Sequence, residues 1–325
     1  MNSISSKRFP LGDRPLSLAM IGLVDGNGHP WSWSAIFNGY DRPAMEACPY
    51  PAIPAYLGKE PDSAFGLGNA RVTHIWTDDP AEAPKIARAS RIDHVLARPE
   101  DAIGRVDAAL IATDIGFEHV ERCRPFIEAG VPVFVDKPMV DNAADLAVFN
   151  RWTAEGRPIL SSSCMRYAKA FLPLRLGTSW LGTLRHITIT MAKTWERYGI
   201  HALEAVYPIT GPGYLSVQSR VEGNRHVAHL AHRNHFDVTV AMAEDLAGAF
   251  GVLQAAGTAG FWQGVNVDTF YTFKEQLAAF VAWLRSGTRP FPWEETDELM
   301  RMVAAGIRSR DEGGRVVTLA EIESP

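Results

Sequence analysis

A lysine stands at the point where a buried strand must end. The tripeptide Asp136-Lys137-Pro138 follows the apolar run of residues 131–135. Apolar runs of this kind belong to parallel sheets that are covered on both faces, and such sheets bind ligands beyond the carboxyl ends of their strands. Pro138 cannot continue the strand, so the chain turns there. We therefore interpret Lys137 as a functional amine at a cleft, the alternative being a surface lysine that merely follows a strand.

A glycine-containing segment, residues 22–33 (Gly-Leu-Val-Asp-Gly-Asn-Gly-His-Pro-Trp-Ser-Trp), follows the first apolar run. A glycine turn between the first strand of a parallel sheet and a helix usually binds the pyrophosphate of a dinucleotide, because free N–H groups and the helix dipole favour anions. The segment departs from the GxGxxG pattern, since Val24 takes the place of the middle glycine. It indicates either a remodelled dinucleotide loop or a turn that only joins a strand to a helix.

The end of the second expected strand bears on the choice of nucleotide, and the chain reads Trp-Thr-Asp-Asp-Pro there. Asp78 or Asp79 in that place would bind ribose hydroxyls and repel a 2′-phosphate, which favours NAD. Alignment on Pro80 puts Thr77 there instead, and an aspartate before a proline is often a helix N-cap. NADP therefore stays open. A later strand ends in the small Thr113, which suits a cofactor lying flat across that edge.

Short apolar runs alternate with helical stretches between residue 16 and about residue 163, a pattern typical of βαβ units and a parallel sheet. Each helical stretch carries apolar residues at steps of three and four. We expect strands at 18–23, 72–77, 108–113, 131–135 and 159–163, helices at 81–89, 117–129 and 142–155, and a short helix from about Ser32 to Asn38.

The connection between the first two strands is about twice as long as a minimal crossover needs. Its surplus, residues 39–68, is rich in Pro, Tyr and Gly and carries Tyr40, Tyr50 and Tyr56. We call this segment the excursion. Ordered loops of this kind often cover a site or meet a partner. A surface elaboration without function is an equal alternative.

The pattern changes after residue 180. Ile187, Ile189 and Met191 face one way along an alternating run and the threonines between them face the other, which predicts an antiparallel sheet. Two amphipathic helices, at about 269–285 and 294–309, come last.

The composition excludes several classes of partner. The 325 residues are 46% hydrophobic and 21% charged, which is ordinary for a soluble globular protein and long enough for two domains. A net charge of -5 gives no field for binding nucleic acid. The apolar stretch 16–24 is shorter than the roughly 20 residues that span a bilayer, so we expect no membrane partner. Cys48, Cys123 and Cys164 lack CxxC spacing, which favours a reducing cytoplasm.

Several ordered motifs together resemble one family, that of glucose-fructose oxidoreductase, inositol dehydrogenase and MocA-type proteins. The resemblance covers nearly the whole chain. It implies an α/β protein with an N-terminal Rossmann domain, a doubly wound parallel sheet over residues 1–160. Residues 161–325 would form an α/β domain with a large open, mainly antiparallel sheet for substrate contact and subunit pairing. The motifs are residues 106–113, His119, and residues 128–138, 199–204, 273–280, 287–290 and 294–296.

The resemblance also implies a tightly held nicotinamide cofactor, and it maps the family's catalytic lysine and histidine onto Lys137 and His201. Oxidising a secondary alcohol needs a base while hydride leaves, and an imidazole with an ordinary pKa of about 6.5 suits that role. Lys137 would stabilise the developing alkoxide, and Glu204 would either orient His201 or face solvent. The expected cofactor contacts are Gly22, Asp25, Gly26, Asn27, Gly28, Trp33, Thr77, Asp78, Thr113, Asp114, His119 and Lys137.

Two departures from the family pattern stand out. Arg197 lies four residues before His201, where the family often has an acid, which puts the proton relay in doubt. Asp25 and Asn27 lie in the glycine loop near the expected phosphates. We hypothesise that Arg166 and Arg197 contact the substrate together with Lys137 and His201, binding a carboxylate or phosphate of a sugar acid or another polyhydroxylated anion. Ion pairs with acids of the chain are the alternative for each arginine.

Four histidines recur at steps of three residues, at His226, His229, His232 and His235. On a strand only His226 with His232, and His229 with His235, would share a side, and no acid or cysteine completes a ligand set. We expect ordinary strand and turn histidines and no metal.

These observations predict an oxidoreductase that transfers hydride between NAD, with NADP not excluded, and a secondary hydroxyl of a sugar, sugar acid or cyclitol. The substrate would be a small carbohydrate-like molecule, and the protein a homodimer or homotetramer formed through its second sheet. One alternative is a redox-neutral enzyme with retained NAD, such as an isomerase, lyase or glycosidase. The other is a non-catalytic, nucleotide-sensing regulatory protein, because fold does not determine function.

Overall fold

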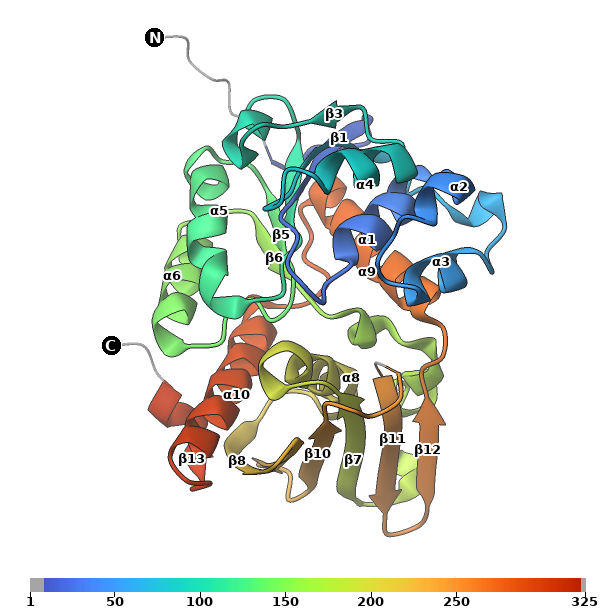
Figure 1. Ribbon diagram of the computed structural model, residues 1–325. Coiled ribbons are helices and arrows are strands. Elements are labelled where there is room, and N and C mark those ends of the chain that lie inside the picture. Colours follow the sequence, from blue (N-terminus) through green and yellow to red (C-terminus); the bar gives the residue numbers. More distant parts are fainter. Residues whose placement is uncertain (1–8, 249, 323–325) are drawn as a thin grey trace.

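The computed structural model describes residues 9–248 and 250–322. Figure 1 shows two layers of structure, one in the upper and one in the lower part of the view, each built on one sheet. The first sheet has six strands and the second has seven. The predicted α/β class, with a parallel sheet followed by a larger and mainly antiparallel one, is confirmed.

The first sheet is parallel throughout, in the order β3-β2-β1-β4-β5-β6. This is the order of a doubly wound fold, in which ligands bind where the direction of winding reverses, between β1 and β4. The five predicted strands are confirmed, with some ends shifted by one or two residues, whereas β3 is too short to show a periodicity. The strands are β1 (Leu16–Ile21), β2 (Ala70–Trp76), β3 (His94–Val95), β4 (Ala108–Ile111), β5 (Val133–Val135) and β6 (Ile159–Ser161).

Helices cover both faces of this sheet, which explains why its inner strands are continuously apolar. All residues of β4 and β5 are buried. The three predicted helices are confirmed as α4 (Ala83–Ala89), α5 (His119–Glu128) and α6 (Ala143–Ala154).

The first helix, α1 (His29–Asn38), begins three residues earlier than the predicted start at Ser32. Pro30 in the first helical turn explains the earlier start, because its fixed φ suits a helix N-terminus and its missing N–H is not needed there. The excursion that follows is ordered and holds α2 (Arg42–Met45), α3 (Ala52–Leu57) and the 3₁₀ turn η1 (Asp62–Ala64).

The second sheet has the order β12-β11-β7-β10-β9-β8-β13. All of its pairs are antiparallel except β7 with β10. Ile187, Ile189 and Met191 are fully buried on one face, as predicted. The strands are β7 (Leu184–Ala192), β8 (Tyr214–Glu222), β9 (Arg225–His232), β10 (Asp237–Ala243), β11 (Phe250–Gly257), β12 (Phe261–Val265) and β13 (Val317–Thr318).

Three longer helices of the C-terminal half of the chain pack on one or the other sheet. α8 (Ile200–Thr210) and α10 (Trp293–Asp311) pack on the second sheet, whereas α9 (Thr269–Ser286) returns to the first sheet beside α1 (Figure 1). Phe280 of α9 contacts Phe134 of β5, with 5.3 Å between ring centroids. The division of the chain at residue 160 stays a prediction, and in space α9 belongs with the first sheet.

Short elements complete the described chain. They matter here because two of them, η4 and the π-helix η7, carry candidate site residues. Among the described residues no helix combines the length and the apolar character that crossing a membrane requires. The short elements are η2 (Pro99–Ala102), η3 (Gly116–Glu118), η4 (Cys164–Tyr167), η5 (Lys169–Phe171), α7 (Leu172–Arg175), η6 (Ser179–Leu181), η7 (Trp195–Gly199) and η8 (Leu319–Ile322).

Candidate functional site

Lys137 lies at the carboxyl edge of the first sheet, just after β5, and its side chain is buried. Its Nζ is 3.5 Å from Asp114 Oδ2 and 5.2 Å from the centroid of the Tyr198 ring, which belongs to η7. Burial lowers the pKa of the Lys137 amine, but Asp136 and Asp114 outweigh burial and raise the pKa above its ordinary value. Lys137 is therefore an ammonium at neutral pH, which can stabilise negative charge but cannot accept a proton.

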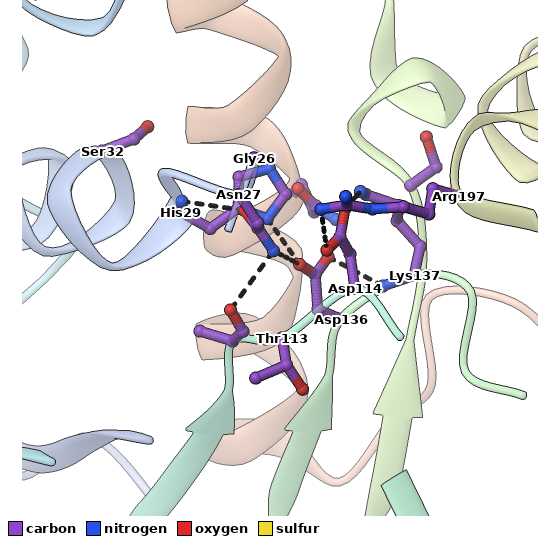
Figure 2. Close-up of polar contacts among 12 residues, drawn as sticks. Gly26, Asn27, His29, Ser32, Thr113, Asp114, Asp136, Lys137 and Arg197 are labelled. Carbon is purple, nitrogen blue, oxygen red and sulfur yellow. Dashed lines mark hydrogen bonds and ion pairs between the residues drawn. The ribbon is translucent and has the colours of Figure 1, made fainter. Parts of the chain in front are cut away.

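Asp114, which follows β4, connects the two layers through an ion pair with Arg197 of η7 (Figure 2). Arg197 donates from Nε to Oδ2 at 2.9 Å and from Nη2 to Oδ1 at 2.6 Å, and its Nη2 also donates to the carbonyl of Asp25 at 2.9 Å. Burial raises the pKa of Asp114, but Lys137 and Arg197 overcome this effect and bring the pKa to about 2. The glycine loop, the ends of β4 and β5, and η7 thus meet around one ionised carboxylate.

A histidine to which the sequence analysis assigned no role lies in the same cluster. His29 opens α1, and its Nδ1 is 2.5 Å from Asp136 Oδ2 (Figure 2). Asp136 is fully buried and also accepts hydrogen bonds from Asn27 Nδ2 at 3.0 Å and from the main-chain N–H of Lys137 at 2.7 Å. The sequence shows an imidazole at the start of a helix beside a glycine loop, and this pattern could have identified His29 as a site residue. Its carboxylate partner, Asp136, lies 107 residues away and could not have been identified from the sequence.

His201 is buried at the start of α8 and shares a neighbour with Lys137. Its ring lies 4.8 Å from the Tyr198 ring, the same ring that the lysine amine contacts. Its Nδ1 is 2.6 Å from the hydroxyl oxygen of Ser163. Burial lowers the pKa of His201 well below its ordinary value, and the charges of Lys137 and His29 lower it further, so this imidazole is neutral.

The start of the glycine loop lies against the ends of β2 and β4. Gly22 has φ +95°, and a Cβ built there would lie 2.6 Å from Thr113 Cγ2, so both the backbone conformation and the close approach require glycine. The next residue, Leu23, donates its N–H to Asp78 Oδ2 at 2.9 Å. Arg122 of α5 pairs with the other oxygen of Asp78 at 2.7 Å. Asp78, rather than Thr77, is therefore the group that faces the loop.

The excursion and the segment after β7 cover the rest of the loop. A Cβ on Gly28 would lie 2.4 Å from Ile53 Cδ1 and 2.7 Å from Tyr50 Cδ2, so this glycine makes room for the excursion. From the other side, Lys193 donates from Nζ to the carbonyl of Gly26 at 3.3 Å. The excursion thus packs directly on the candidate site, in agreement with the covering role that was one of its two interpretations.

Three predicted cofactor contacts are engaged within the protein. Thr77 donates its hydroxyl proton to the carbonyl of Asp79. His119 is fully buried between the carbonyl of Met139, at 2.9 Å, and that of Thr113, at 2.8 Å. Trp33 is fully buried beneath the His29 ring, with 4.4 Å between ring centroids. These residues support the walls of the site.

Arg166 lies in a buried ion network. It donates from Nε to Glu204 and from Nη1 to Glu295 Oε2, the latter at 2.7 Å, and it stacks on Phe291 at 4.0 Å from the ring centroid. Glu204 also accepts the main-chain N–H of Ser163 at 3.0 Å. Glu204 therefore neither faces solvent nor pairs with His201, so both expectations for it were wrong. For Arg166 and for Arg197, the structure contains the ion pairs with the chain's own acids that were the alternative interpretation.

The histidines at steps of three behave as strand and turn residues. On β9, His226 and His232 are buried on one side, as expected, and His229 is exposed. His226 stacks on Trp195 and His232 on Phe236. Within residues 9–248 and 250–322, no group of three or more His, Cys, Asp or Glu side chains is arranged to hold a metal ion.

Comparisons with known proteins agree with this architecture. Residues 52–155 match the model of the oxidoreductase family with an NAD-binding Rossmann fold. Over 103 residues the chain is 34% identical to the inositol 2-dehydrogenase of Rhodococcus erythropolis, a match that covers 31% of this chain and 30% of the relative's length.

Solved structures of inositol dehydrogenases share the whole fold. The myo-inositol 2-dehydrogenase of Lactobacillus plantarum superposes with a TM-score of 0.74 at 14% identity, covering 94% of this chain and 99% of that one. The scyllo-inositol dehydrogenase of Lactobacillus casei, solved with bound NAD(H) and scyllo-inositol, gives 0.69 at 13% identity over 94% and 99% of the two chains. The model that residues 52–155 match is that of the glucose-fructose oxidoreductase, inositol dehydrogenase and MocA-type family, and the likeness to these solved structures extends the shared fold over nearly the whole chain.

Proposed function

We propose that the protein is a nicotinamide-dependent dehydrogenase that interconverts a secondary hydroxyl and a ketone on a small polyhydroxylated molecule, a sugar, sugar acid or cyclitol. The observation that carries the proposal is the buried Lys137 ammonium at the carboxyl edge of the parallel sheet, beside Tyr198 and His201. The names of the relatives, which are inositol dehydrogenases, support the substrate class.

The adenosine end of the site fits a dinucleotide. Gly22 lets the loop approach the end of β4 closely. Asp78 accepts a hydrogen bond from the main-chain N–H of Leu23, at the place where an acid binds the ribose hydroxyls in this type of fold. Asp78 repels a 2′-phosphate and so favours NAD, whereas its neighbour Arg122 would attract one. We propose NAD as the cofactor, and the substrate screen described below compares it with NADP.

The phosphate-binding part of the loop has an unusual composition. The N–H of His29 donates to Asn27 Oδ1 at 3.0 Å and Pro30 has no N–H, so the N-terminus of α1 offers fewer amides to an anion than usual. Two cations from outside the first sheet, Lys193 and Arg197, donate hydrogen bonds to main-chain carbonyls of the same loop. The positive charge that a pyrophosphate needs would therefore come partly from side chains.

A bound nicotinamide supplies the acceptor for hydride. Lys137 holds the substrate oxygen and stabilises the negative charge that develops on it, an effect that is strong where water is excluded. His201 is neutral, so it can hydrogen-bond the substrate hydroxyl. A positive charge on His201 is unfavourable, because the ring is buried near Lys137.

The test is a substrate screen with purified protein. Inositols, aldoses and aldonic acids are each mixed with NAD⁺ or NADP⁺, and reduced cofactor is followed by its absorbance. Reduced cofactor that forms with at least one polyol supports a dehydrogenase. Product without net reduction would show a redox-neutral enzyme. No turnover with any substrate, and no nucleotide binding, would refute the proposal in favour of another role for the fold.

A matched pair of variants connects the activity to the site. Lys137→Met should lower kcat by about 10²–10³-fold, the cost of removing one group that stabilises an oxyanion. Lys169→Met is the control, because Lys169 is a half-exposed lysine paired with Asp268 away from the cluster. Equal activity of the two variants would remove Lys137 from the chemistry.

We also propose that two or more copies associate through the second sheet. Large apolar side chains are exposed on its strands, among them Phe261 at 83% and Val227 at 44% exposure. Exposed apolar surface of this kind often marks an interface. Sedimentation analysis of the wild type and of Phe261→Asp checks this: a wild type that is monomeric at micromolar concentration contradicts it.

A further inference from the structure

We propose that His29, oriented by Asp136, accepts the proton of the substrate hydroxyl. This inference rests on the dehydrogenase function proposed above and adds a residue from the glycine loop to its chemistry. Asp136 is the positioning residue, since it acts through the imidazole. His29 lies on the side of the cluster opposite to Arg197, and Asp136 lies between them (Figure 2).

The hydrogen bonds of Asp136 determine which nitrogen of His29 carries a proton. An ionised carboxylate only accepts hydrogen bonds, so Nδ1 of His29, 2.5 Å from Oδ2, must be the donor. The carboxylate cannot turn away, because Asn27 Nδ2 donates to the same oxygen and the Lys137 N–H donates to the other. Neutral His29 therefore has a bare Nε2, which is the form that a general base needs.

The imidazole ring itself is held in place. It stacks on Trp33 with 4.4 Å between centroids and 16° between planes, and Phe273 of α9 meets it edge-on at 5.1 Å. The side chain keeps 12% exposure. Within the described parts of the chain, the hydrogen bonds of His29 involve only Nδ1 and the main-chain N–H. Its Nε2 is thus available to a ligand.

His201 lacks this support. Its Nδ1 meets the hydroxyl of Ser163 and not a carboxylate. Glu204, one turn further along α8, is engaged by Arg166. Arg197, which stands where the family often has an acid, pairs with Asp114 instead. Among the described residues, the imidazole of His201 thus has a hydroxyl as its hydrogen-bond partner, whereas the imidazole of His29 has a carboxylate.

The oxidation breaks two bonds of the substrate. The substrate C–H bond breaks and hydride goes to an oxidised nicotinamide, the O–H bond breaks and its proton goes to Nε2 of His29, and the C=O bond of the ketone forms. Asp136 stabilises the resulting imidazolium through Nδ1–H, as carboxylates do in other histidine pairs. Lys137 keeps its proton throughout and stabilises the substrate oxygen.

The pH dependence of this step depends on the whole cluster. The charged or titratable groups around His29 are Asp136 and Lys137 after β5, Asp114 after β4, Arg197 and His201 from η7 and α8, and Lys193 after β7. Asp114 and Lys137 keep their charges at neutral pH. A change of activity between about pH 5 and 8 is therefore assigned to an imidazole.

The first experiment compares three histidine variants of the full chain. His29→Gln should lower kcat for alcohol oxidation by about 10²–10⁴-fold, the usual contribution of a general base, and should leave the Kd of reduced cofactor within about threefold. His201→Gln should cost less than His29→Gln. His229→Gln, at an exposed histidine of β9, should keep wild-type kcat. Circular dichroism and the melting temperature show whether each variant is folded.

The second experiment needs no turnover. In cofactor-free protein labelled with ¹⁵N-histidine, the His29 signals, assigned by their loss in His29→Gln, should show a protonated Nδ1 and an unprotonated Nε2. Asp136→Asn should change this tautomer, because the amide can donate to Nδ1, and should lower kcat in parallel. A folded Asp136→Asn protein that keeps both the tautomer and kcat refutes the role of Asp136.

The outcomes separate this inference from the proposed function. A wild type that oxidises polyols while His29→Gln keeps more than a third of its kcat refutes the inference and leaves the dehydrogenase in place. A wild type that neither binds nicotinamide nor turns over a polyol refutes the function itself. An Nε2-protonated His29 in the ¹⁵N spectrum refutes the inference in either case, and also where a variant fails to fold.

Discussion

Replacing Asp114 by Asn is the sharpest test of the charge cluster. The change keeps the size of the side chain and removes the carboxylate that Lys137 and Arg197 share. Asp114 is 1% exposed, so water cannot take its place without local opening. We expect a clear loss of stability, because a buried ammonium would lose one of its two neighbouring acids.

The size of the loss can be estimated in two ways. Charges 3.5 Å apart, as in Lys137 and Asp114, attract by about 5 kcal/mol at an effective dielectric constant of about 20, and desolvation offsets part of this. Independently, lowering the pKa of Asp114 from 3.8 to about 2 corresponds to about 2 kcal/mol. Arg197 is 29% exposed and can turn to solvent, which limits its share. We expect Asp114→Asn to lower the free energy of unfolding by about 3 kcal/mol.

Urea unfolding followed by tryptophan fluorescence measures this change. Asp237→Asn is the control, because the Asp237 side chain is 50% exposed and lies 3.7 Å from His229, so its loss should cost less than about 0.5 kcal/mol. The stabilising effect of Asp114 is present above the pKa of the unfolded chain and is lost as the pH falls from about 4 through about 2. Asp114→Asn should therefore flatten the stability profile in that window. Equal unfolding midpoints for the two variants would refute the electrostatic reasoning.

Three further results are expected. Burial lowers the pKa of His201, so the buried imidazole stabilises the fold fully above about pH 6.5, and the free energy of unfolding falls below that pH by up to about 1.4 kcal/mol per pH unit for this group. His201→Gln should therefore flatten the plot of melting temperature against pH between pH 7.5 and 5.5, and an unchanged slope of that plot would contradict this. Gly28→Ala should lower the free energy of unfolding by about 1–3 kcal/mol, because the new methyl group pushes the excursion away. Gly260→Ala is the control, because a Cβ there makes only an ordinary contact, 3.8 Å from Leu181 Cδ2; equal urea midpoints for the two variants would show that the contact at Gly28 is loose. Arg166→Met should lower the free energy of unfolding by about 3–5 kcal/mol, because it leaves the buried Glu204 without its cation. A stable, folded variant with a raised KM for acidic sugars would instead show that Arg166 binds the substrate.

Local patterns in the sequence were sufficient for the parallel sheet and for the place of Lys137. Buried parallel strands must be continuously apolar, and the lysine that follows such a run must lie at the edge where these sheets bind ligands. The start of α1 was predicted three residues too late, because no apolar periodicity marks its first turn. The strand β3 has only two residues and therefore no periodicity at all.

By itself, the sequence determined the class of fold and one amine of the site, because apolar periodicity and turn residues act over a few neighbouring positions. The tertiary structure alone decided the partners of the charged groups. The chain has 37 acidic and 32 basic residues, and spacing does not show that His29 meets Asp136 or that Arg197 meets Asp114. Those pairs join segments 107 and 83 residues apart. Such contacts depend on how whole elements pack together, and the packing of the excursion on Gly28 is decided in the same way.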